Sequence, residues 1–458
     1  MNVLPALGMH NDTGLLEHVR QALQSPYQGY AYAYPHKKTY RPIAPALPLG
    51  QVWENEQRHD IGVYVHIPFC EMRCGFCNLF ATTNAAADRV ETYMAALIRE
   101  AQAVRDAVGT VQPQSLTIGG GTPTYLNARD LARLLELMAG LFNAEPCDTT
   151  TAIETSPGTA TPERMALLAS YGVSRISIGV QSFVEDEMRA LGRPQRVRES
   201  TAALDCIRSH AFRTLNIDLM YGMAGQTPSS LEHSLRQALA WQPEEIFLYP
   251  LYVRPLTGLD GRARTFDEHR QKLYEAGRAL LASEGYMQRS MRMFVHERQA
   301  GTESGGSAYG EAGPVDRAVI GLGCGARSRV SDMHYSKEYA VERRAVLSIV
   351  EDYCSRSSSR FAVADYGVAL NFGEQARRRI VLDSITANGL DIEDFTATYG
   401  GEPASHIAEI GPLIEMGYLQ RTATHLKATP KGLAVADAIG PLLISPAMEM
   451  RMAAYTLR

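Results

Sequence analysis

Three cysteines within eight residues constrain this chain more than any other feature of its sequence. Cys70, Cys74 and Cys77 follow C-x3-C-x2-C spacing, directly after a β-rich segment that ends at Ile67. The spacing suits three corners of a cubane iron–sulfur cluster, which normally takes four cysteine thiolates. The fold must therefore hold this loop around a cluster, and three ligands leave one iron open to another molecule.

Two other uses of cysteine fit the sequence poorly. A structural zinc site needs a second ligand pair further along the chain, but the remaining cysteines stand singly, at Cys147, Cys206, Cys324 and Cys354. No secretory signal pattern opens the sequence, and seven cysteines is an odd number. We therefore expect reduced cysteines rather than disulfides.

The composition indicates an intracellular enzyme with one large core. The chain has 458 residues, of which 45% are hydrophobic, and a net charge of −5. No apolar run is long enough to cross a bilayer. Slight acidity argues against a dedicated nucleic-acid surface, which usually needs a basic patch. We expect a cytoplasmic protein with neither a membrane span nor a nucleic-acid partner.

Beyond the cysteine loop, short β-rich segments alternate with amphipathic helical segments. This alternation is typical of βα units and a parallel sheet. The predicted strands are Gly62 to Ile67, Ser115 to Ile118, Thr151 to Thr155, Arg175 to Ile178, Leu215 to Leu219 and Glu245 to Tyr249. Six such units predict an α/β fold, a partial (β/α)6 barrel of the TIM type.

Two of the helices between these strands are well marked in the sequence. Apolar residues predict one helix from about Ala128 to Phe142. Another begins with Thr161 as its N-cap and Pro162 at its first position, and Gly172 follows its end. These boundaries fix the spacing of the neighbouring strands along the chain.

Chemically capable residues lie at the ends of five predicted strands. The cysteine loop follows the first strand, Gly119 to Gly121 follow the second, and Glu154 ends the third. Gln181 comes just after the fourth, and Asp218 lies near the end of the fifth. In a parallel βα barrel the ligand site is built from the loops at these strand ends. We therefore expect one shared mouth.

Five strings together resemble the radical S-adenosylmethionine (SAM) superfamily. They are Tyr64 to Cys70, Cys70 to Cys77, Gly119 to Thr124, Ser177 to Phe183 and Asn216 to Gly222. Within the superfamily they resemble the oxygen-independent coproporphyrinogen III oxidases and their relative, the haem chaperone. The resemblance runs from about residue 61 to residue 330 and resumes in the C-terminal segment.

This resemblance implies the cofactors and the reaction. Cys70, Cys74 and Cys77 would be the catalytic cluster ligands, and SAM would chelate the open iron of a [4Fe–4S] cluster. An electron from the cluster would split SAM into methionine and a 5′-deoxyadenosyl radical, which abstracts hydrogen from an organic substrate. The cofactors carry this chemistry, while the protein places them and excludes water. The implied partners are a small-molecule substrate and an electron donor such as flavodoxin or ferredoxin.

The resemblance also implies which residues contact the cofactor. Carried over position by position, they are Tyr64, Phe76, Gly120, Gly121, Thr122, Glu154, Gln181, Arg193 and Asp218. Phe76 is expected beside the adenine, and the two glycines allow backbone to approach the methionyl end. An alternative for Arg193 is a surface salt bridge at a helix end.

Some members of this group hold a second SAM molecule beside the first. The equivalent wall here would include Tyr252 and the glycine-rich stretch from Gly321 to Arg327. The alternative is that this stretch is a tight packing turn, with Cys324 as a small buried side chain.

One departure from the group bears on the reaction. The coproporphyrinogen oxidases carry a fourth cysteine two residues past the third, whereas this chain reads Cys77-Asn78-Leu79. The haem chaperones lack that cysteine and carry a string like the one around Cys324. Three functions therefore stay open: a radical SAM enzyme for oxidation, rearrangement or radical methylation, a haem-handling chaperone, and the oxidase itself.

The sequence divides into four segments. We expect an N-terminal arm at 1–60, the barrel at 61–300, a connecting segment at 301–365 and a C-terminal domain at 366–458. The tyrosine-rich arm resembles that of a little-characterised bacterial subfamily, and it either packs on the barrel or covers its mouth. A glycine-rich stretch at 299–313 reads as a surface loop.

The C-terminal domain is predicted as three helices and a small hairpin, which resembles a winged helix. The helices are placed at Glu374 to Ile385, Asp391 to Tyr399 and Ile407 to Met416. Such a domain can bind DNA, but the run from Arg377 to Arg379 is interpreted as a solvated helix face. We expect an accessory to the barrel.

Overall fold

The computed structural model divides the chain into two compact units. It describes residues 12–30, 33–193, 195–262, 266–299 and 317–458. One unit comprises residues 36–371 and 450–458, and the other comprises residues 1–35 and 372–449. The glycine-rich stretch predicted as a surface loop lies almost wholly outside the described residues.

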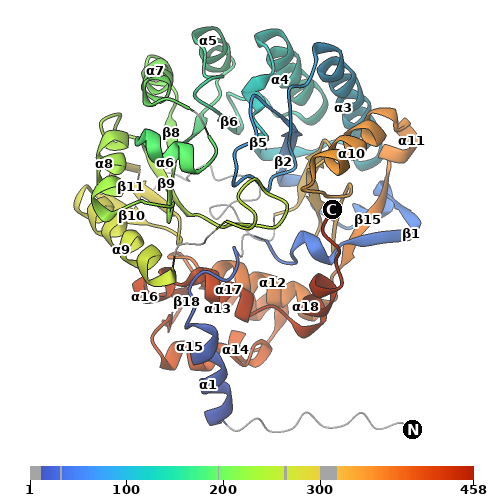
Figure 1. Ribbon diagram of the computed structural model, residues 1–458. Coiled ribbons are helices and arrows are strands. Elements are labelled where there is room, and N and C mark those ends of the chain that lie inside the picture. The colour runs from blue at the N-terminus through green and yellow to red at the C-terminus, as the bar shows by residue number, and fades with distance from the viewer. Residues whose placement is uncertain (1–11, 31–32, 194, 263–265, 300–316) are drawn as a thin grey trace, which may run out of the picture. The chain divides into compact units, whose positions relative to one another are not determined.

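The larger unit contains the predicted parallel barrel sheet (Figure 1). Its six strands are β2 (His59–Ile67), β5 (Gln112–Gly120), β6 (Thr150–Thr155), β7 (Arg175–Gln181), β8 (Thr214–Tyr221) and β9 (Glu245–Pro250). Each pairs in parallel with the next. The prediction of six βα units in a partial barrel is confirmed, and the strands extend the predicted cores by a few residues.

Helices follow the strands along the outer side of the curved sheet (Figure 1). They are α3 (Ala87–Val108), α4 (Ala128–Phe142), α5 (Pro162–Ser170), α6 (Glu185–Ala190), α7 (Val197–Arg208), α8 (Pro228–Leu239) and α9 (Asp267–Ser283). The side chain of Thr161 accepts the Arg164 N–H and caps α5 as predicted, and Gly172 follows with a φ of +80°. Asn127 caps α4 in the same way.

A seventh parallel strand was missed in the sequence. In β12 (Val319–Leu322), Gly321 pairs beside Tyr64 of β2, the strand that carries the cysteine loop. A four-residue strand with three apolar residues and one glycine is too short to be distinguished from a turn by pattern alone. The stretch from Gly321 is therefore partly strand and only then turn.

Antiparallel strands extend both edges of this sheet. Beyond β12 lie β13 (Arg327–Arg329), β14 (Met333–Ser336), β15 (Val363–Ala369) and β1 (Arg41–Pro48), and beyond β9 lie β11 (Met293–His296) and β10 (Tyr286–Gln288). The short helices α2 (Leu49–Val52), α10 (Arg343–Ser355) and α11 (Ser358–Phe361) belong to the same unit.

These additions alter the predicted domain limits. Residues 36–60 and the predicted connecting segment join the barrel unit, whereas residues 1–35 group with the C-terminal residues. The difference arises because sheet pairing is non-local: β1 finds its partner β15 more than three hundred residues away in the sequence.

The interior of the barrel is polar along the middle strands. Residues two apart on a strand share a face, and on β7 and β8 that face carries Arg175, Ser177, Asn216 and Asp218. Arg175 forms a buried ion pair of 2.7 Å with Glu245 on β9. Asn216 Nδ2 donates to Ser177 Oγ at 2.6 Å and to Asp218 Oδ1 at 2.7 Å. These polar contacts run along the inside of the barrel toward the C-terminal ends of the strands.

The smaller unit has the predicted winged-helix pattern. Its helices are α1 (Asp12–Ala22), α12 (Phe372–Ser384), α13 (Ile392–Tyr399), α14 (Pro403–His406), α15 (Ile410–Glu415), α16 (Pro430–Leu433) and α17 (Ala436–Leu442). The hairpin β17 (Leu419–Arg421) and β18 (His425–Ala428) gains a third strand, β16 (Leu390–Asp391). Helix α18 (Pro446–Ala453) crosses the division between the units.

The three consecutive arginines of α12 do not form the solvated face that was expected. Arg378 is buried, at 2% exposure. Arg377 donates to the Leu443 carbonyl at 2.8 Å, and Arg379 pairs with Asp383 and Asp394. Their guanidinium groups serve contacts within the unit. Across the described part of the chain, no helix combines the length and apolarity needed to span a membrane.

Candidate active site

The cysteine loop is fixed at both ends and in its middle. Its first residue lies in β3 (Phe69–Cys70), which pairs with β4 (Thr82–Thr83) just beyond the loop. Gly75 donates its N–H to Leu191 O at 2.9 Å and accepts from Leu259 N–H at 2.8 Å. Within the described residues, all three thiols are free and partly buried. The loop is therefore held between the ends of neighbouring barrel strands.

Hydrogen-bond donors from the loop after β5 and from the segment after α6 point at the sulfurs. Thr122 Oγ1 lies 3.6 Å from Cys70 Sγ, and Arg193 Nη1 lies 3.7 Å from Cys74 Sγ. Burial is the main reason why the pKa of Cys70 rises to about 12, and the neighbouring thiols raise it further. Burial raises the pKa of Cys77 as well. Positive charge would favour the thiolate forms of Cys70 and Cys77, and cluster irons supply it.

The surroundings of the triad fit an iron–sulfur cluster. In the described part of the chain, no three His, Cys, Asp or Glu side chains come close enough to hold a single metal ion. The fit rests instead on the donors aimed at the sulfurs and on Gly121, where a Cβ atom would stand 2.8 Å from Cys70 Sγ. Only glycine leaves room for backbone this close to the ligand.

Arg193 is a buried connector rather than a surface residue. It is 8% exposed, and Nη2 donates to Gly179 O at 2.6 Å while Nε donates to Gln195 Oε1 at 2.9 Å. With its bond to Cys74, the guanidinium joins the cysteine loop to the end of β7. The alternative of a surface salt bridge is therefore wrong.

The glycine loop after β5 packs against the opposite carboxylate. A Cβ on Gly119 would lie 2.8 Å from Glu154 Oε1, and the Gly120 N–H donates to Glu154 Oε2 at 3.2 Å. Gly120 has a φ of +121°, a conformation that side chains with a Cβ rarely adopt. The loop is thus shaped by Glu154 on one side and by β2 on the other.

Two partly buried carboxyl groups lie under this mouth. Burial raises the pKa of Glu154 to about 7, and the charge of Asp218 adds to the rise. Burial also raises the pKa of Asp218 to about 6, against the hydrogen bond from Asn216 and the charges of Arg175 and Arg193. A cation bound between them would favour both carboxylates.

Gln181 adopts a strained backbone at the end of β7. Its φ is +73°, and the pairing of β7 with β8 is irregular between Gly179 and Gln181. Non-glycine residues in this region cost free energy and occur mainly where function requires a fixed direction. The bulge turns the Gln181 amide back toward Gly179, where a Cβ would lie 2.9 Å from Gln181 Nε2.

The three predicted aromatic residues lie on different sides of the mouth. Tyr64 is buried beside Val319 and Ala326 of the seventh strand and the turn after it. Phe76 packs on an apolar cluster formed by Met188, Leu191, Met220, Met223 and Leu259. Tyr252 lies in the loop after β9, with the Arg254 guanidinium 4.4 Å over its ring.

His66 is a positioning residue that the sequence did not reveal. Its Nε2 lies 2.8 Å from Phe80 O, which can only accept, so Nε2 carries the proton and Nδ1 accepts from the Tyr64 hydroxyl at 3.2 Å. Burial lowers its pKa to about 4, so the ring is neutral. Cβ atoms on Gly120 and Gly325 would lie within 3 Å of this ring. The imidazole thus separates the glycine loop after β5 from a second glycine loop, residues 321–325.

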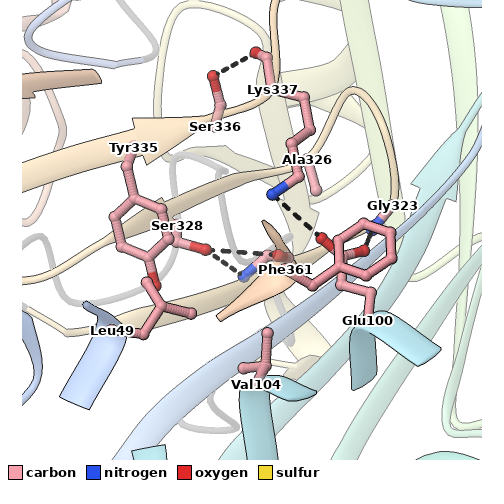
Figure 2. A pocket seen from close by; sticks show the side chains of 11 residues that line it. Leu49, Glu100, Val104, Gly323, Ala326, Ser328, Tyr335, Ser336, Lys337 and Phe361 are labelled. Carbon is pink, nitrogen blue, oxygen red and sulfur yellow. Dashed lines mark hydrogen bonds and ion pairs between the residues drawn. The ribbon is translucent and has the colours of Figure 1, made fainter. Parts of the chain in front are cut away.

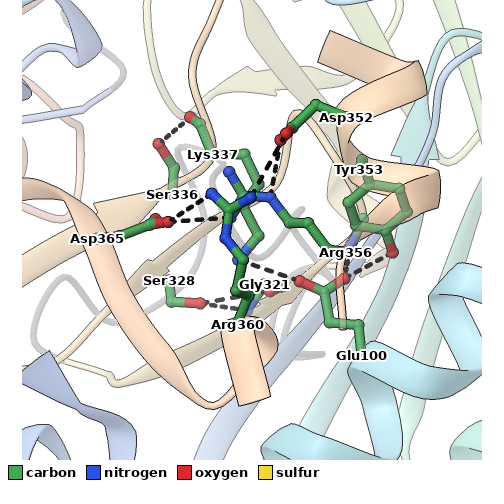
Figure 3. Close-up of polar contacts among 11 residues, drawn as sticks. Glu100, Gly321, Ser328, Ser336, Lys337, Asp352, Tyr353, Arg356, Arg360 and Asp365 are labelled. Carbon is green, nitrogen blue, oxygen red and sulfur yellow. Dashed lines mark hydrogen bonds and ion pairs between the residues drawn. The ribbon is translucent and has the colours of Figure 1, made fainter. Parts of the chain in front are cut away.

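A buried ion pair holds the second glycine loop in place. Glu100 is 2% exposed and accepts the Gly323 N–H at 2.6 Å and the Tyr353 hydroxyl at 2.8 Å. Lys337 Nζ lies 3.5 Å from its other oxygen. Figure 2 shows this pair in a small pocket, and Figure 3 shows the neighbouring contacts of Arg356 and Arg360 with Asp352 and Asp365. Cys324, at 0% exposure, is buried as predicted.

The two residues after Cys77 have different surroundings. The Asn78 carbonyl accepts the Tyr339 hydroxyl at 2.5 Å. Leu79 is 50% exposed, although it stands where the oxidases of the group have a fourth cysteine. An exposed leucine at this place provides no ligand for a metal.

Comparison with known proteins identifies two matching regions. The family model of the radical SAM superfamily matches residues 64–238, and that of the HemN C-terminal domain matches residues 373–435. An oxygen-independent coproporphyrinogen III oxidase of Pseudomonas aeruginosa is 27% identical over 372 residues, 78% of each chain. The heme chaperone HemW of Escherichia coli is 30% identical over 280 residues, 59% of this chain and 70% of HemW.

A solved structure supports the fold. Coproporphyrinogen III oxidase (HemN) from Escherichia coli superposes with a TM-score of 0.74 at 23% identity, over 90% of this chain and 96% of that one. At this level of identity the likeness concerns the fold. It includes the barrel and the C-terminal region.

Proposed function

Because the chain belongs to the radical SAM superfamily, in the group of the HemN oxidases and HemW chaperones, we propose that it is a radical SAM enzyme acting on a tetrapyrrole. The relatives are named for coproporphyrinogen III and heme, which are both tetrapyrroles. The observation that carries the enzyme assignment is the thiol triad with donors aimed at two of its sulfurs, above two partly buried carboxyl groups.

Cys70, Cys74 and Cys77 would hold the cluster. A [4Fe–4S] cluster held there would supply the electron for the reductive cleavage of SAM. Thr122 and Arg193 keep two of the ligands oriented by their bonds to Cys70 and Cys74. The packing of the loop on Leu191 and Leu259 excludes water from its inner side.

The rest of the mouth suits the groups of SAM. Glu154 and Asp218 are partly buried and coupled by charge, so an ammonium or sulfonium cation between them would be favourable. Gly120 and Gly121 give backbone access, and Gln181 adds an amide fixed by the β7 bulge. Phe76 offers an aromatic face on the apolar side, where we place the adenine. Tyr64 and Tyr252 would complete the site, the latter toward a second SAM.

The proposed reaction begins with hydrogen abstraction from the substrate. Oxidation, rearrangement or methylation with a second SAM then follows. Leu79 at the place of the fourth cysteine separates this chain from the oxidases of the group. A haem-carrying function of the HemW type is the second candidate, because that identity of 30% extends over 70% of HemW. We further place the protein in the reducing cytoplasm, with a flavodoxin or ferredoxin as the electron donor.

One assay separates the two candidates. The protein is reconstituted anaerobically with iron and sulfide, then incubated with SAM, dithionite and a tetrapyrrole, with Cys74→Ala as the control. An enzyme gives 5′-deoxyadenosine or S-adenosylhomocysteine that depends on the tetrapyrrole. A protein that binds haem tightly but gives neither product with any tetrapyrrole is a carrier.

A further inference from the structure

Three cationic side chains from separate parts of the barrel unit gather beside the cluster loop. Lys37 lies in the short 3-10 helix η1 (Lys37–Thr39), Arg254 in the loop after β9, and Arg327 at the start of β13. All three are partly buried. Their positions in the sequence are more than seventy residues apart, so no local pattern brings them together.

Their neighbours place Lys37 and Arg254 at the mouth. Lys37 Nζ lies 3.3 Å from the centroid of the Tyr339 ring, and the Tyr339 hydroxyl bonds to the carbonyl of Asn78, the residue after Cys77. The Arg254 guanidinium lies 4.4 Å over the ring of Tyr252. Two of the three cations thus rest on aromatic faces.

The charged side chains that act most strongly on Lys37 and His36 are mainly positive. Burial lowers the pKa of Lys37, and the charges of Arg327, Lys38 and Arg254 lower it further, while the Cys77 thiol acts in the opposite direction. The same arginines and Lys37 lower the pKa of His36, after burial as the largest cause. Placing like charges together out of water costs stability. Such an arrangement is typical of a site that receives an anion.

We propose that Lys37, Arg254 and Arg327 form a cationic wall that binds a carboxylate of the substrate beside the cluster. The inference rests on the proposed tetrapyrrole substrate, whose side chains include carboxylates, and it assigns the residues that hold one of them. An ammonium and two guanidinium groups bind a carboxylate through charge-assisted hydrogen bonds. The wall would hold the tetrapyrrole by one edge, next to the loop that carries Cys77.

Two other anions could use the same charges: the carboxylate of a second SAM, and the cluster with its thiolate ligands. These alternatives are distinguished by whether the Lys37→Met variant loses porphyrin binding, SAM affinity or iron content. Because this substitution removes a cation that is surrounded by cations, we expect the variant to unfold at a higher temperature than the wild type. A lysine with a purely structural role would give the opposite shift.

The test measures binding of coproporphyrin III and of its tetramethyl ester to the cluster-loaded protein, in the same mild detergent. Lys37→Met should weaken binding of the acid about 10- to 100-fold, the usual effect of losing a hydrogen bond to a charged group. Binding of the ester should be unchanged. Lys37→Arg should restore binding of the acid. The control is Lys272→Met, at an exposed position of α9, which removes only the ion pair with Glu268.

Each other outcome overturns the proposal. Equal binding of the acid by wild type and Lys37→Met removes the wall but leaves the tetrapyrrole substrate in place. Loss of SAM affinity or of iron content, with the porphyrin unaffected, assigns the cations to SAM or to the cluster. If the wild type binds neither probe, the tetrapyrrole assignment itself fails, and the wall fails with it.

Discussion

Replacing Gly121 with alanine tests whether the cluster loop needs a glycine beside its first ligand. The added Cβ would lie 2.7 Å from Phe69 O and 2.8 Å from Cys70 Sγ, whereas carbon contacts normally begin near about 3.5 Å. The backbone has little freedom to move away, because Gly121 N–H donates to Ile67 O and Thr122 N–H donates to Phe69 O, both at 2.8 Å. The methyl group must therefore displace both the Phe69 carbonyl and the Cys70 thiol.

The expected effect follows from the cost of overpacking. Forcing an extra methyl group into a packed site costs about 1–3 kcal/mol. If this cost falls on the cluster-loaded state, cluster retention weakens about 5- to 150-fold. The assay is anaerobic reconstitution followed by titration with an iron chelator, with visible absorption and iron content as readouts and circular dichroism as the check on folding.

A matched control is available on α4. Gly140 is exposed, and a Cβ added there would have no heavy atom within 4 Å. Gly140→Ala should therefore leave the cluster unchanged and stabilise the helix by about 0.5–1 kcal/mol. Folded Gly121→Ala protein that resists the chelator as well as the wild type would refute the reasoning.

Three further predictions concern the thiols, the carboxyl groups and the buried ion pair. Cys74→Ala should lose the visible absorption of the cluster, whereas Cys147→Ala should keep the full iron content; retention of four irons in Cys74→Ala would exclude that ligand. Because burial raises the pKa of Glu154 to about 7, its neutral form stabilises the fold at low pH and this contribution is lost as pH rises through 7. Glu154→Gln should therefore raise the free energy of unfolding of the cofactor-free protein at pH 8, by on the order of 2–3 kcal/mol, and change it little at pH 5; urea titrations that show the larger gain at pH 5 would contradict this. Glu100→Ala leaves Lys337 and the Gly323 N–H without their carboxylate partner, so it should lower the free energy of unfolding by about 3–5 kcal/mol. Glu100→Gln should lower it less, since it keeps an acceptor for Gly323. Equal urea midpoints for wild type and Glu100→Ala would disprove this role.

The sequence predicted the elements whose signals are local. The six barrel strands and helix α4 follow from periodicity over a few residues, and the cap at Thr161 follows from its own side chain and the proline after it. The short strand β12 escaped prediction because three apolar residues and a glycine are too few to show a periodic pattern. The pairing of β1 with β15 escaped it because the two strands are far apart in the sequence.

The candidate site shows the same division. The residues at strand ends could be expected to meet, since parallel strands bring their C-terminal ends to one edge. The burial of Arg193 and its bond to Cys74 could not be predicted, because a lone arginine after a helix is equally compatible with a surface position. His66 was passed over for a similar reason: its role depends on two glycine loops that only the fold brings to opposite faces of its ring.

The sequence by itself determined that three thiols lie together and that glycines, carboxyl groups and an amide follow the neighbouring strands, because ligand spacing and strand order are properties of the chain. Only the tertiary structure decided the electrostatics of the mouth. Burial raises the pKa of Glu154 and Asp218 there, and folding gathers Lys37, Arg254 and Arg327 beside the cluster loop. Desolvation and charge coupling depend on distances in space, which the order of residues along the chain does not contain.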